Sequence, residues 1–268
     1  MTLPTIPTSS TRGSSAPGTR STVATVVVPA HDEAENLARL VSELGAALPD
    51  PRRLAAIVVV DDGSTDGTPT LLRDLARAEP RLHTSRHPTR RGQTAALLTG
   101  FRLATTPLVA TLDADLQCHP RDLPALLDAL GGADMAAGVR RERHDPATRR
   151  LASALANRAR RLVLAPVLED LACPLRVMRR AALVRLEAEG MLFDGAHRWL
   201  PALFQLAGFR VVQRPVPHHP RCAGTSKYTT RGRVLPIARE LARVLAFAAA
   251  RAVRPSPAVA QPPPAREA

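Results

Sequence analysis

Short apolar runs alternate with helical patterns through the first half of the chain. Segments 23–28, 57–60 and 108–112 are dominated by Val, Ile, Leu and Ala, as is typical of strands buried on both faces of a parallel sheet. In segments 33–44 and 68–75 apolar residues recur three and four apart, which indicates helices. Strands and helices in this order require right-handed parallel crossovers. The sequence therefore predicts an α/β, Rossmann-like fold with a mostly parallel central sheet flanked by helices.

The pattern is weaker in the second half. Segments 134–139 and 210–216 are predicted strands, the Arg-rich segment 140–161 is helical in its second half, and 218–233 is a basic loop. Residues 234–251 form a predicted amphipathic helix. Its apolar face would carry Val234, Ile237, Leu241, Leu245 and Ala248.

We expect a single folded domain with appendages at both ends. Residues 1–21 are rich in Ser, Thr, Pro and Gly without the apolar core of a signal peptide, and we interpret them as a disordered leader. The domain would cover residues 22–232, followed by the amphipathic helix at 233–253 and a disordered Pro-rich tail at 254–268. No apolar run reaches the ~18 residues of a membrane span. The expected location is cytoplasmic, with peripheral attachment to the inner face of the cell membrane left open.

Charge and composition restrict the partners. A net charge of +13 implies attraction to nucleic acid, anionic lipid or a phosphorylated substrate. Aromatic residues make up only 3%, and no nucleic-acid-binding motif accompanies the charge, so we expect no specific nucleic-acid partner. The three cysteines are odd in number and far apart, which favours neither a disulfide framework nor a zinc site.

Acidic residues follow two of the predicted strands, where open α/β sheets bind ligands. Asp113 and Asp115 come directly after the third strand, and Gln117 adds a neutral oxygen. Oxygen ligands of this kind favour Mg²⁺ or Mn²⁺, completed by a substrate diphosphate. An isolated pair of this type can also cap a helix or face solvent, but its position after a buried strand favours the metal site.

Asp61 and Asp62 end the second strand and precede a Gly-containing turn. A carboxylate at this position can accept a hydrogen bond from a base or ribose, and the glycines let backbone approach a ligand. Taken alone, the same residues favour an ordinary Asp/Gly turn.

Together, segments 26–36, 58–68 and 112–117 closely resemble family 2 glycosyltransferases of the GT-A fold. The resemblance is greatest to the branch with dolichol-phosphate mannose synthases and bacterial polyprenyl-phosphate sugar transferases, which segments 138–140, 170–176 and 219–228 also resemble. It covers about residues 22–230.

The resemblance implies a role for each matched residue. Metal ligands would be Asp113, Asp115 and Gln117, with Mg²⁺ or Mn²⁺ as the cofactor, and the catalytic candidates are Asp115 and Asp170. Asp170 would act on the acceptor side or as a base, although a helix cap or surface acid is an equal alternative. The nucleotide sugar would be bound by Pro29, His31, Glu33, Asp61, Asp62, Asp113, Ala114, Arg140, Arg221 and Lys227. His31 stands where the family often has tyrosine.

The implied reaction is an inverting transfer of one hexose from a UDP- or GDP-sugar to a polyprenyl or dolichyl phosphate. The Gln-x-x-Arg-Trp motif of processive synthases is approached only by His197-Arg198-Trp199, which lacks the glutamine, so we expect one sugar per turnover. A soluble glycan, protein or small-molecule acceptor is the alternative, and a non-catalytic basic nucleic-acid-binding protein is a remote one. The helix at 233–253 would lie on an anionic membrane, pack on the domain or mediate dimerisation.

Overall fold

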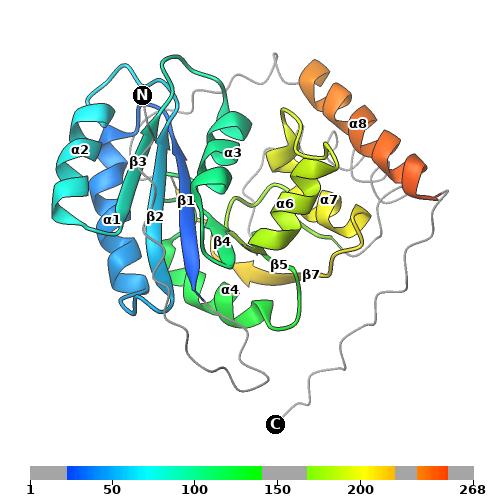
Figure 1. Cartoon of the computed structure of the whole chain (residues 1–268), viewed down its shortest axis with the longest axis horizontal. Coiled ribbons are helices and arrows are strands. Elements are labelled where there is room, and N and C mark those ends of the chain that lie inside the picture. Colours follow the sequence, from blue (N-terminus) through cyan, green and yellow to red (C-terminus); the bar gives the residue numbers. More distant parts are fainter. Residues whose placement is uncertain (1–22, 141–167, 221–233, 253–268) are drawn as a thin grey trace, which may run out of the picture.

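The computed structural model describes residues 23–140, 168–220 and 234–252. A seven-stranded sheet with the order β3-β2-β1-β4-β6-β5-β7 runs through the molecule (Figure 1). Strands β1, β2, β3 and β4 pair in parallel. The predicted leader, the Pro-rich tail and the helix within 140–161 lie outside the described residues, as do Cys222, Arg221 and Lys227.

The first half of the chain builds the parallel half of the sheet. Its elements are β1 (Ala24–Ala30), α1 (Ala34–Ala47), β2 (Leu54–Asp61), α2 (Thr68–Ala78), β3 (Leu82–Arg86), α3 (Gln93–Leu103) and β4 (Leu108–Thr111). The three strands expected from their apolar runs are all present. Strand β3 was not predicted, because it lies at the sheet edge and its Leu-His-Thr-Ser-Arg sequence carries mostly polar residues.

The second half adds two antiparallel pairings. Its elements are η1 (Pro120–Asp122), α4 (Leu123–Leu130), β5 (Met135–Arg140), β6 (Arg176–Arg179), α6 (Arg180–Ala188), η2 (Ala196–Arg198), α7 (Leu200–Leu206), β7 (Val211–Val216) and α8 (Val234–Ala252). Strand β6 pairs antiparallel with both β4 and β5, whereas β5 and β7 are parallel. The predicted fold class is thus confirmed. The sequence did not predict β6, which has only four residues and an arginine at each end.

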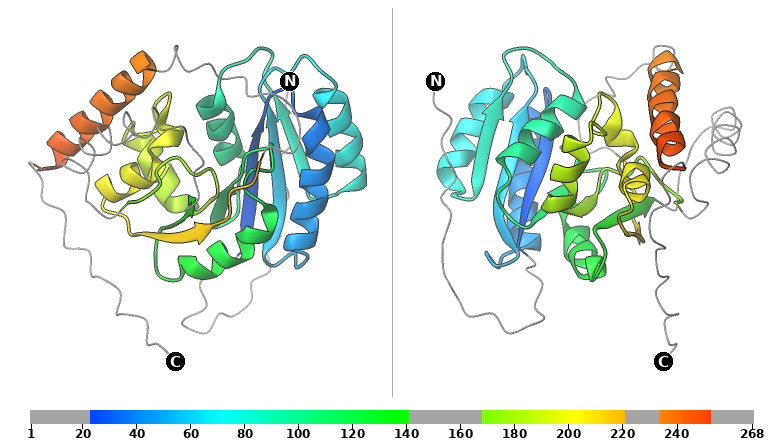
Figure 2. Two further views of the ribbon diagram at one scale, coloured as in Figure 1. Left: turned by 180° about the vertical axis from the view of Figure 1, so that it is seen from behind. Right: turned by 45° about the vertical axis from the view of Figure 1, so that its right-hand side comes forward.

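Alternating strand residues direct the packing of the two helical layers. Val26 and Val28 belong to the apolar cluster that includes α1, α2 and α4. Val27 faces the opposite way, into a second cluster with α3, α6 and α7. Figures 1 and 2 show these helices on the two faces of the sheet. The uninterrupted apolar sequence of β1 is required because both of its faces are covered.

Helix α8 packs on the second layer through a face that is rotated from the predicted one, although Leu241 of the predicted face also packs against that layer. Val244 is fully buried, while Ile237 on the predicted apolar face is 40% exposed. The helix instead turns Glu240 inward, where its carboxylate accepts hydrogen bonds from Arg198 Nη1 at 2.5 Å and Trp199 Nε1 at 2.9 Å. The inward face of α8 therefore includes a buried, charge-assisted contact that apolar spacing alone does not indicate. In the part of the chain that the structure describes, no helix has the length and apolarity needed to span a membrane.

Close contact between α3 and β1 gives a test of the packing. A Cβ atom at Gly100 would lie 2.2 Å from Val27 Cγ1, so Gly100→Ala should lower the free energy of unfolding by about 1–3 kcal/mol despite alanine's better helix propensity. Gly45→Ala is the matched control, because the nearest obstacle to its Cβ is the flexible end of Arg81. That variant should be neutral or more stable by up to about 1 kcal/mol. Urea unfolding of both variants checks the prediction, and equal effects would contradict this packing.

Candidate active site

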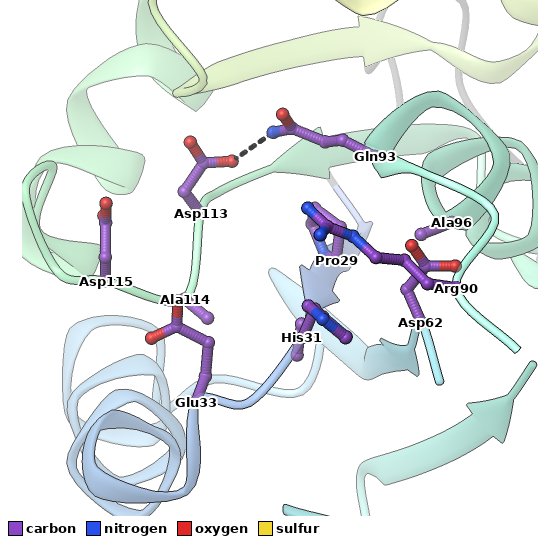
Figure 3. Close-up of a pocket in the computed structure, with 11 residues that line it drawn as sticks. Pro29, His31, Glu33, Asp62, Arg90, Gln93, Ala96, Asp113, Ala114 and Asp115 are labelled. Atoms are coloured by element: carbon purple, nitrogen blue, oxygen red, sulfur yellow. Dashed lines mark hydrogen bonds between the residues drawn. The ribbon is translucent and has the colours of Figure 1, made fainter. Parts of the chain in front are cut away.

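Loops at the carboxyl ends of β1, β2 and β4 surround one pocket (Figure 3). Parallel pairing brings these ends together, since Ala30 lies opposite Asp61 and Val27 lies opposite Thr111. The loop that leads from β3 into α3 closes another side. The lining residues are Pro29, Ala30, His31, Glu33, Asp62, Arg90, Gln93, Ala96, Asp113, Ala114 and Asp115. The structure therefore brings together seven of the residues expected to bind the nucleotide sugar or metal.

Two carboxylates stand close together after β4. Asp115 is 7% exposed, and Asp113 Oδ1 accepts a hydrogen bond from Gln93 Nε2 at 2.9 Å. Burial, together with the negative charge of Asp115, raises the pKa of Asp113 to about 7. The positive charges of Arg176 and Arg140 lower the pKa of Asp113, but burial and Asp115 have the larger effect. A cation bound between these carboxylates would relieve this repulsion.

The backbone between these ligands adopts a conformation uncommon for its residue type. Leu116 has φ of 57°, in the left-handed region that costs a non-glycine residue roughly 1–2 kcal/mol. Its side chain is fully buried, and that burial offsets the cost. The turn also lets the Gln117 N–H donate to Asp115 Oδ1 at 3.2 Å. Packing thus holds the Asp113–Gln117 loop in a shape that its local sequence alone would disfavour.

The described residues fit a divalent cation only in part. No cluster of three His, Cys, Asp or Glu side chains suited to a metal occurs within ranges 23–140, 168–220 and 234–252. The buried oxygens of Asp113 and Asp115 are the right donors for Mg²⁺ or Mn²⁺, and such ions commonly complete their shell with water and substrate phosphate. Gln117 does not line the pocket, and its role as third ligand stays a prediction.

Asp62 organises the loop that closes the pocket. Its Oδ1 lies 2.7 Å from His87 Nδ1 and accepts from Arg91 N at 2.8 Å, while Oδ2 accepts from Gly92 N at 2.7 Å. Gly63 lets this loop approach, because a Cβ there would lie 2.5 Å from Arg90 N. Asp62 therefore holds the 87–92 loop in place while lining the pocket, and this loop was not identified from the sequence.

Asp61 lies buried next to the pocket without lining it. Its Oδ1 accepts from Ser64 N at 2.8 Å, and its Oδ2 lies 3.1 Å from Arg86 Nε. These contacts fix the turn after β2. The expected contact of Asp61 with a nucleoside stays a prediction.

The other side of the pocket is formed by the segment between β1 and α1. His31 Nε2 lies 3.4 Å from Asp32 Oδ2. The backbone of Asp32 is in the left-handed region, with φ of 50°. Glu33 accepts from Asn36 Nδ2 at 2.7 Å. Figure 3 shows Glu33 and His31 beside the Asp113–Asp115 loop, with Arg90 reaching in from the other wall. The hydrogen bond from Asn36 thus orients the Glu33 carboxylate, and both Glu33 and His31 line the pocket.

Arg140 and Asp170, expected in separate roles, bind each other. Arg140 Nε donates to Asp170 Oδ2 at 2.7 Å and Nη2 donates to Oδ1 at 3.1 Å. Burial disfavours the charged guanidinium, but the hydrogen bonds and charge of Asp170 outweigh this and raise the pKa of Arg140. The Ala172 N–H also donates to Asp170 at 3.0 Å. These contacts support a positioning role for Asp170, and its function as a base stays a prediction.

Two cysteines that are distant in sequence meet beside this pair. Cys118 and Cys173 are buried free thiols. The hydrogen bond between them and their burial raise the pKa of the Cys118 thiol well above its usual range. Their contact joins the loop after the Asp113–Gln117 segment to the loop before β6.

Two polar lining residues, Arg90 and Gln93, were not predicted from the sequence. Gln93 begins α3 and Arg90 belongs to the preceding loop. No acidic motif or apolar run marks either residue, and their approach depends on the crossover from β3 to α3. A basic residue beside a predicted phosphate site was the only available signal for Arg90.

Comparisons with known proteins agree with this geometry. The sequence profile of the family described as Glycosyl transferase family 2 matches residues 25–186. Two curated relatives share the name undecaprenyl-phosphate 4-deoxy-4-formamido-L-arabinose transferase. The one from Aeromonas hydrophila is 33% identical over 205 residues and the one from Klebsiella pneumoniae subsp. pneumoniae is 34% identical over 209 residues. Each match covers 76% of this chain, and the chain spans 62% of the length of these relatives.

Two solved structures share the fold. A mannosyltransferase from Pyrobaculum calidifontis in complex with GDP-Man and Mn²⁺ has a TM-score of 0.54 and 22% identity, covering 87% of this chain and 76% of its own. Glucosyl-3-phosphoglycerate synthase from Mycobacterium tuberculosis in complex with Mg²⁺ and UDP has a TM-score of 0.60 and 17% identity. The match covers 88% of this chain and 81% of the synthase chain. At these identities the likeness concerns the fold.

The raised pKa of Asp113 predicts that removing its charge increases the stability of the metal-free protein and weakens ligand binding. Without metal, Asp113→Asn should be more stable than wild type above pH 7, because the variant carries no repelled buried charge. The difference should vanish as the pH falls from about 7 to about 4, where the wild-type carboxyl becomes protonated. The same variant should lose the rise in melting temperature produced by Mn²⁺ with UDP. Thermal melts across this pH range, with the exposed Asp74→Asn as control, test both effects. A less stable variant that still responds to Mn²⁺ would contradict the account.

Proposed function

Because the chain belongs to glycosyl transferase family 2, we propose that it transfers one hexose from a UDP- or GDP-sugar to a lipid phosphate. The observation that carries this proposal is the carboxylate pair of Asp113 and Asp115. The pair lies at the carboxyl end of β4, inside a pocket lined by Pro29, His31 and Glu33. This arrangement is suited to a cation and a diphosphate.

Different residues of the pocket would bind different parts of the donor. Asp113 and Asp115 would hold Mg²⁺ or Mn²⁺, which supplies positive charge to the diphosphate leaving group when bound. Arg90 is placed to add a guanidinium to the same phosphates. Gln93 fixes the orientation of the Asp113 carboxylate through its hydrogen bond. These groups stabilise the charge that develops as the sugar leaves.

A lipid phosphate fits the acceptor role for a chemical reason. An alcohol acceptor must lose a proton to a base, whereas a phosphate is already ionised at neutral pH. Asp170, the acid proposed for acceptor-side chemistry, is engaged by Arg140 and the Ala172 N–H. The names of the two curated relatives, which specify undecaprenyl phosphate, support the same class of acceptor.

The location proposed for the enzyme is the inner face of the cell membrane, reached by peripheral binding. Arg239 and Arg243 lie exposed on α8, where each would contribute about 1 kcal/mol of attraction to an anionic bilayer. Arg251 is turned toward the domain and contacts Glu189. Any membrane contact by α8 would therefore be made by its exposed residues, which include Arg239 and Arg243.

Removal of the charge of Asp115 should abolish transfer. Asp115→Asn preserves shape and should lower kcat at least ~100-fold, about 3 kcal/mol of lost transition-state stabilisation. The measurement is nucleotide release from a panel of UDP- and GDP-sugars with membrane lipid extract, at saturating Mg²⁺ or Mn²⁺. Near wild-type turnover by this variant would exclude the carboxylate pair as the metal site.

The membrane proposal is best tested with surface charges, because truncation of α8 would also remove Glu240 from Arg198 and Trp199. The double variant Arg239→Gln/Arg243→Gln should bind phosphatidylglycerol vesicles on the order of tenfold more weakly at low salt while releasing nucleotide at the wild-type rate. Arg73→Gln/Arg77→Gln removes the same charge from α2 and should bind as wild type. If the wild-type protein does not sediment with these vesicles at low salt, peripheral binding is wrong.

A further inference from the structure

A second cavity borders the donor pocket. Asp113 and Gln93 line both cavities. Leu97 of α3 and Thr111 of β4 also line the second cavity, and the rest of its wall comes from the loop before β6 and from β6, η2 and α8. Polar groups reach it from Arg176, His197 and Arg198. The second cavity is therefore placed to hold a molecule that reacts with a donor beside Asp113.

Arg176 contributes a buried cation to this cavity. The residue is 3% exposed, and its Nη2 donates to the Leu171 carbonyl at 3.1 Å. Its Nε has no hydrogen-bond partner among the described residues. Burial lowers the pKa of Arg176, and the negative charges of Asp113 and Asp170 compensate this only in part. A buried guanidinium with an unsatisfied N–H and incomplete charge compensation is costly. An anionic ligand in the cavity would supply the missing partner.

His197 adds a neutral hydrogen-bond donor. Its Nδ1 lies 2.7 Å from Thr94 Oγ1, and that oxygen also accepts from the Gly195 N–H at 2.9 Å. The Thr94 hydroxyl has a second lone pair and one proton, so it can accept from Nδ1–H or donate to Nδ1. In the second arrangement the imidazole proton lies on Nε2. Burial, together with the charges of Arg198 and Arg176, lowers the pKa of His197 to about 3. The ring is neutral at physiological pH, and with its proton on Nε2 it can donate one hydrogen bond to a ligand.

Helix α8 completes the wall and orients the second cation. Glu240 binds Arg198 through Nη1 at 2.5 Å, and Ile237 lines the cavity from the same helix. Leu97 and Pro174 supply further apolar surface. The cavity thus combines cationic groups with apolar walls, as required for a phosphate carried on an apolar group.

We propose that this second cavity binds the phosphate monoester of the acceptor, with Arg176 and His197 as its phosphate-binding residues. The inference rests on the proposed transferase function and specifies its acceptor site. A phosphate oxygen bound here attacks the anomeric carbon of the sugar. A new C–O bond forms, the bond from that carbon to the diphosphate breaks, and its electron pair leaves with the nucleoside diphosphate. The ionised phosphate has no proton to lose, so the step yields a sugar phosphodiester without a base.

The test is a calorimetric titration of full-length protein with farnesyl phosphate, glycerol 3-phosphate and farnesol. Wild type should bind farnesyl phosphate and not farnesol. Arg176→Gln should weaken farnesyl phosphate binding roughly 10- to 100-fold, because a hydrogen-bonded charge is lost. His197→Phe keeps a ring and should weaken binding roughly three- to tenfold. Arg102→Gln removes an exposed arginine on α3 and serves as the matched control with wild-type affinity.

The two phosphates distinguish the source of the acceptor. Tighter binding of farnesyl phosphate supports a lipid, and equal binding of glycerol 3-phosphate supports a soluble phosphate in the same site. Unchanged affinity in both Arg176→Gln and His197→Phe, or no binding of either phosphate to wild type, would overturn the proposal. UDP affinity with Mn²⁺, measured on the same samples, shows whether the variants are folded. Its retention separates failure of the acceptor site from failure of the proposed function.

Discussion

Two carboxylates one residue apart lie partly or wholly buried after β4, and the charge of Asp115 opposes ionisation of Asp113. Such an arrangement is unfavourable unless a cation or a proton compensates it. The surrounding structure maintains it: Gln93 binds one carboxylate, and the buried side chain of Leu116 stabilises an uncommon backbone conformation. The site therefore stores a cost that binding of a cation and diphosphate would relieve, which couples ligand binding to stability.

The two halves of the sheet supply different parts of the site. Parallel strands β1, β2 and β4 gather the acidic loops at one edge, as their register requires. Antiparallel β6 brings Arg176 alongside β4, where Thr111 is its partner. Helix α8 then covers the cationic side through Glu240. An acidic pocket and a cavity with cationic groups meet at Asp113, a division that would suit the proposed transfer between two phosphorylated molecules.

Local sequence patterns predicted the parts of this arrangement that depend on nearest neighbours. Apolar runs located β1, β2 and β4, and the acidic residues after them located the pocket. Sequence reasoning missed features that arise from tertiary contact. Arg140 and Asp170 were assigned separate roles because nothing local indicates their pairing. Arg176 resembles a surface arginine until β6 is placed between β4 and β5, and Glu240 resembles a solvent-facing residue until α8 is docked.

The central claim is that Asp113 and Asp115 together bind a divalent cation that also contacts the donor's diphosphate. Anomalous diffraction at the manganese edge, from crystals grown with UDP and Mn²⁺, tests it most directly. The account predicts one strong anomalous peak within about 2.0–2.4 Å of an oxygen of each carboxylate and of the UDP diphosphate. UDP bound in the pocket with no anomalous peak at these carboxylates, or with the peak at another site, would contradict it.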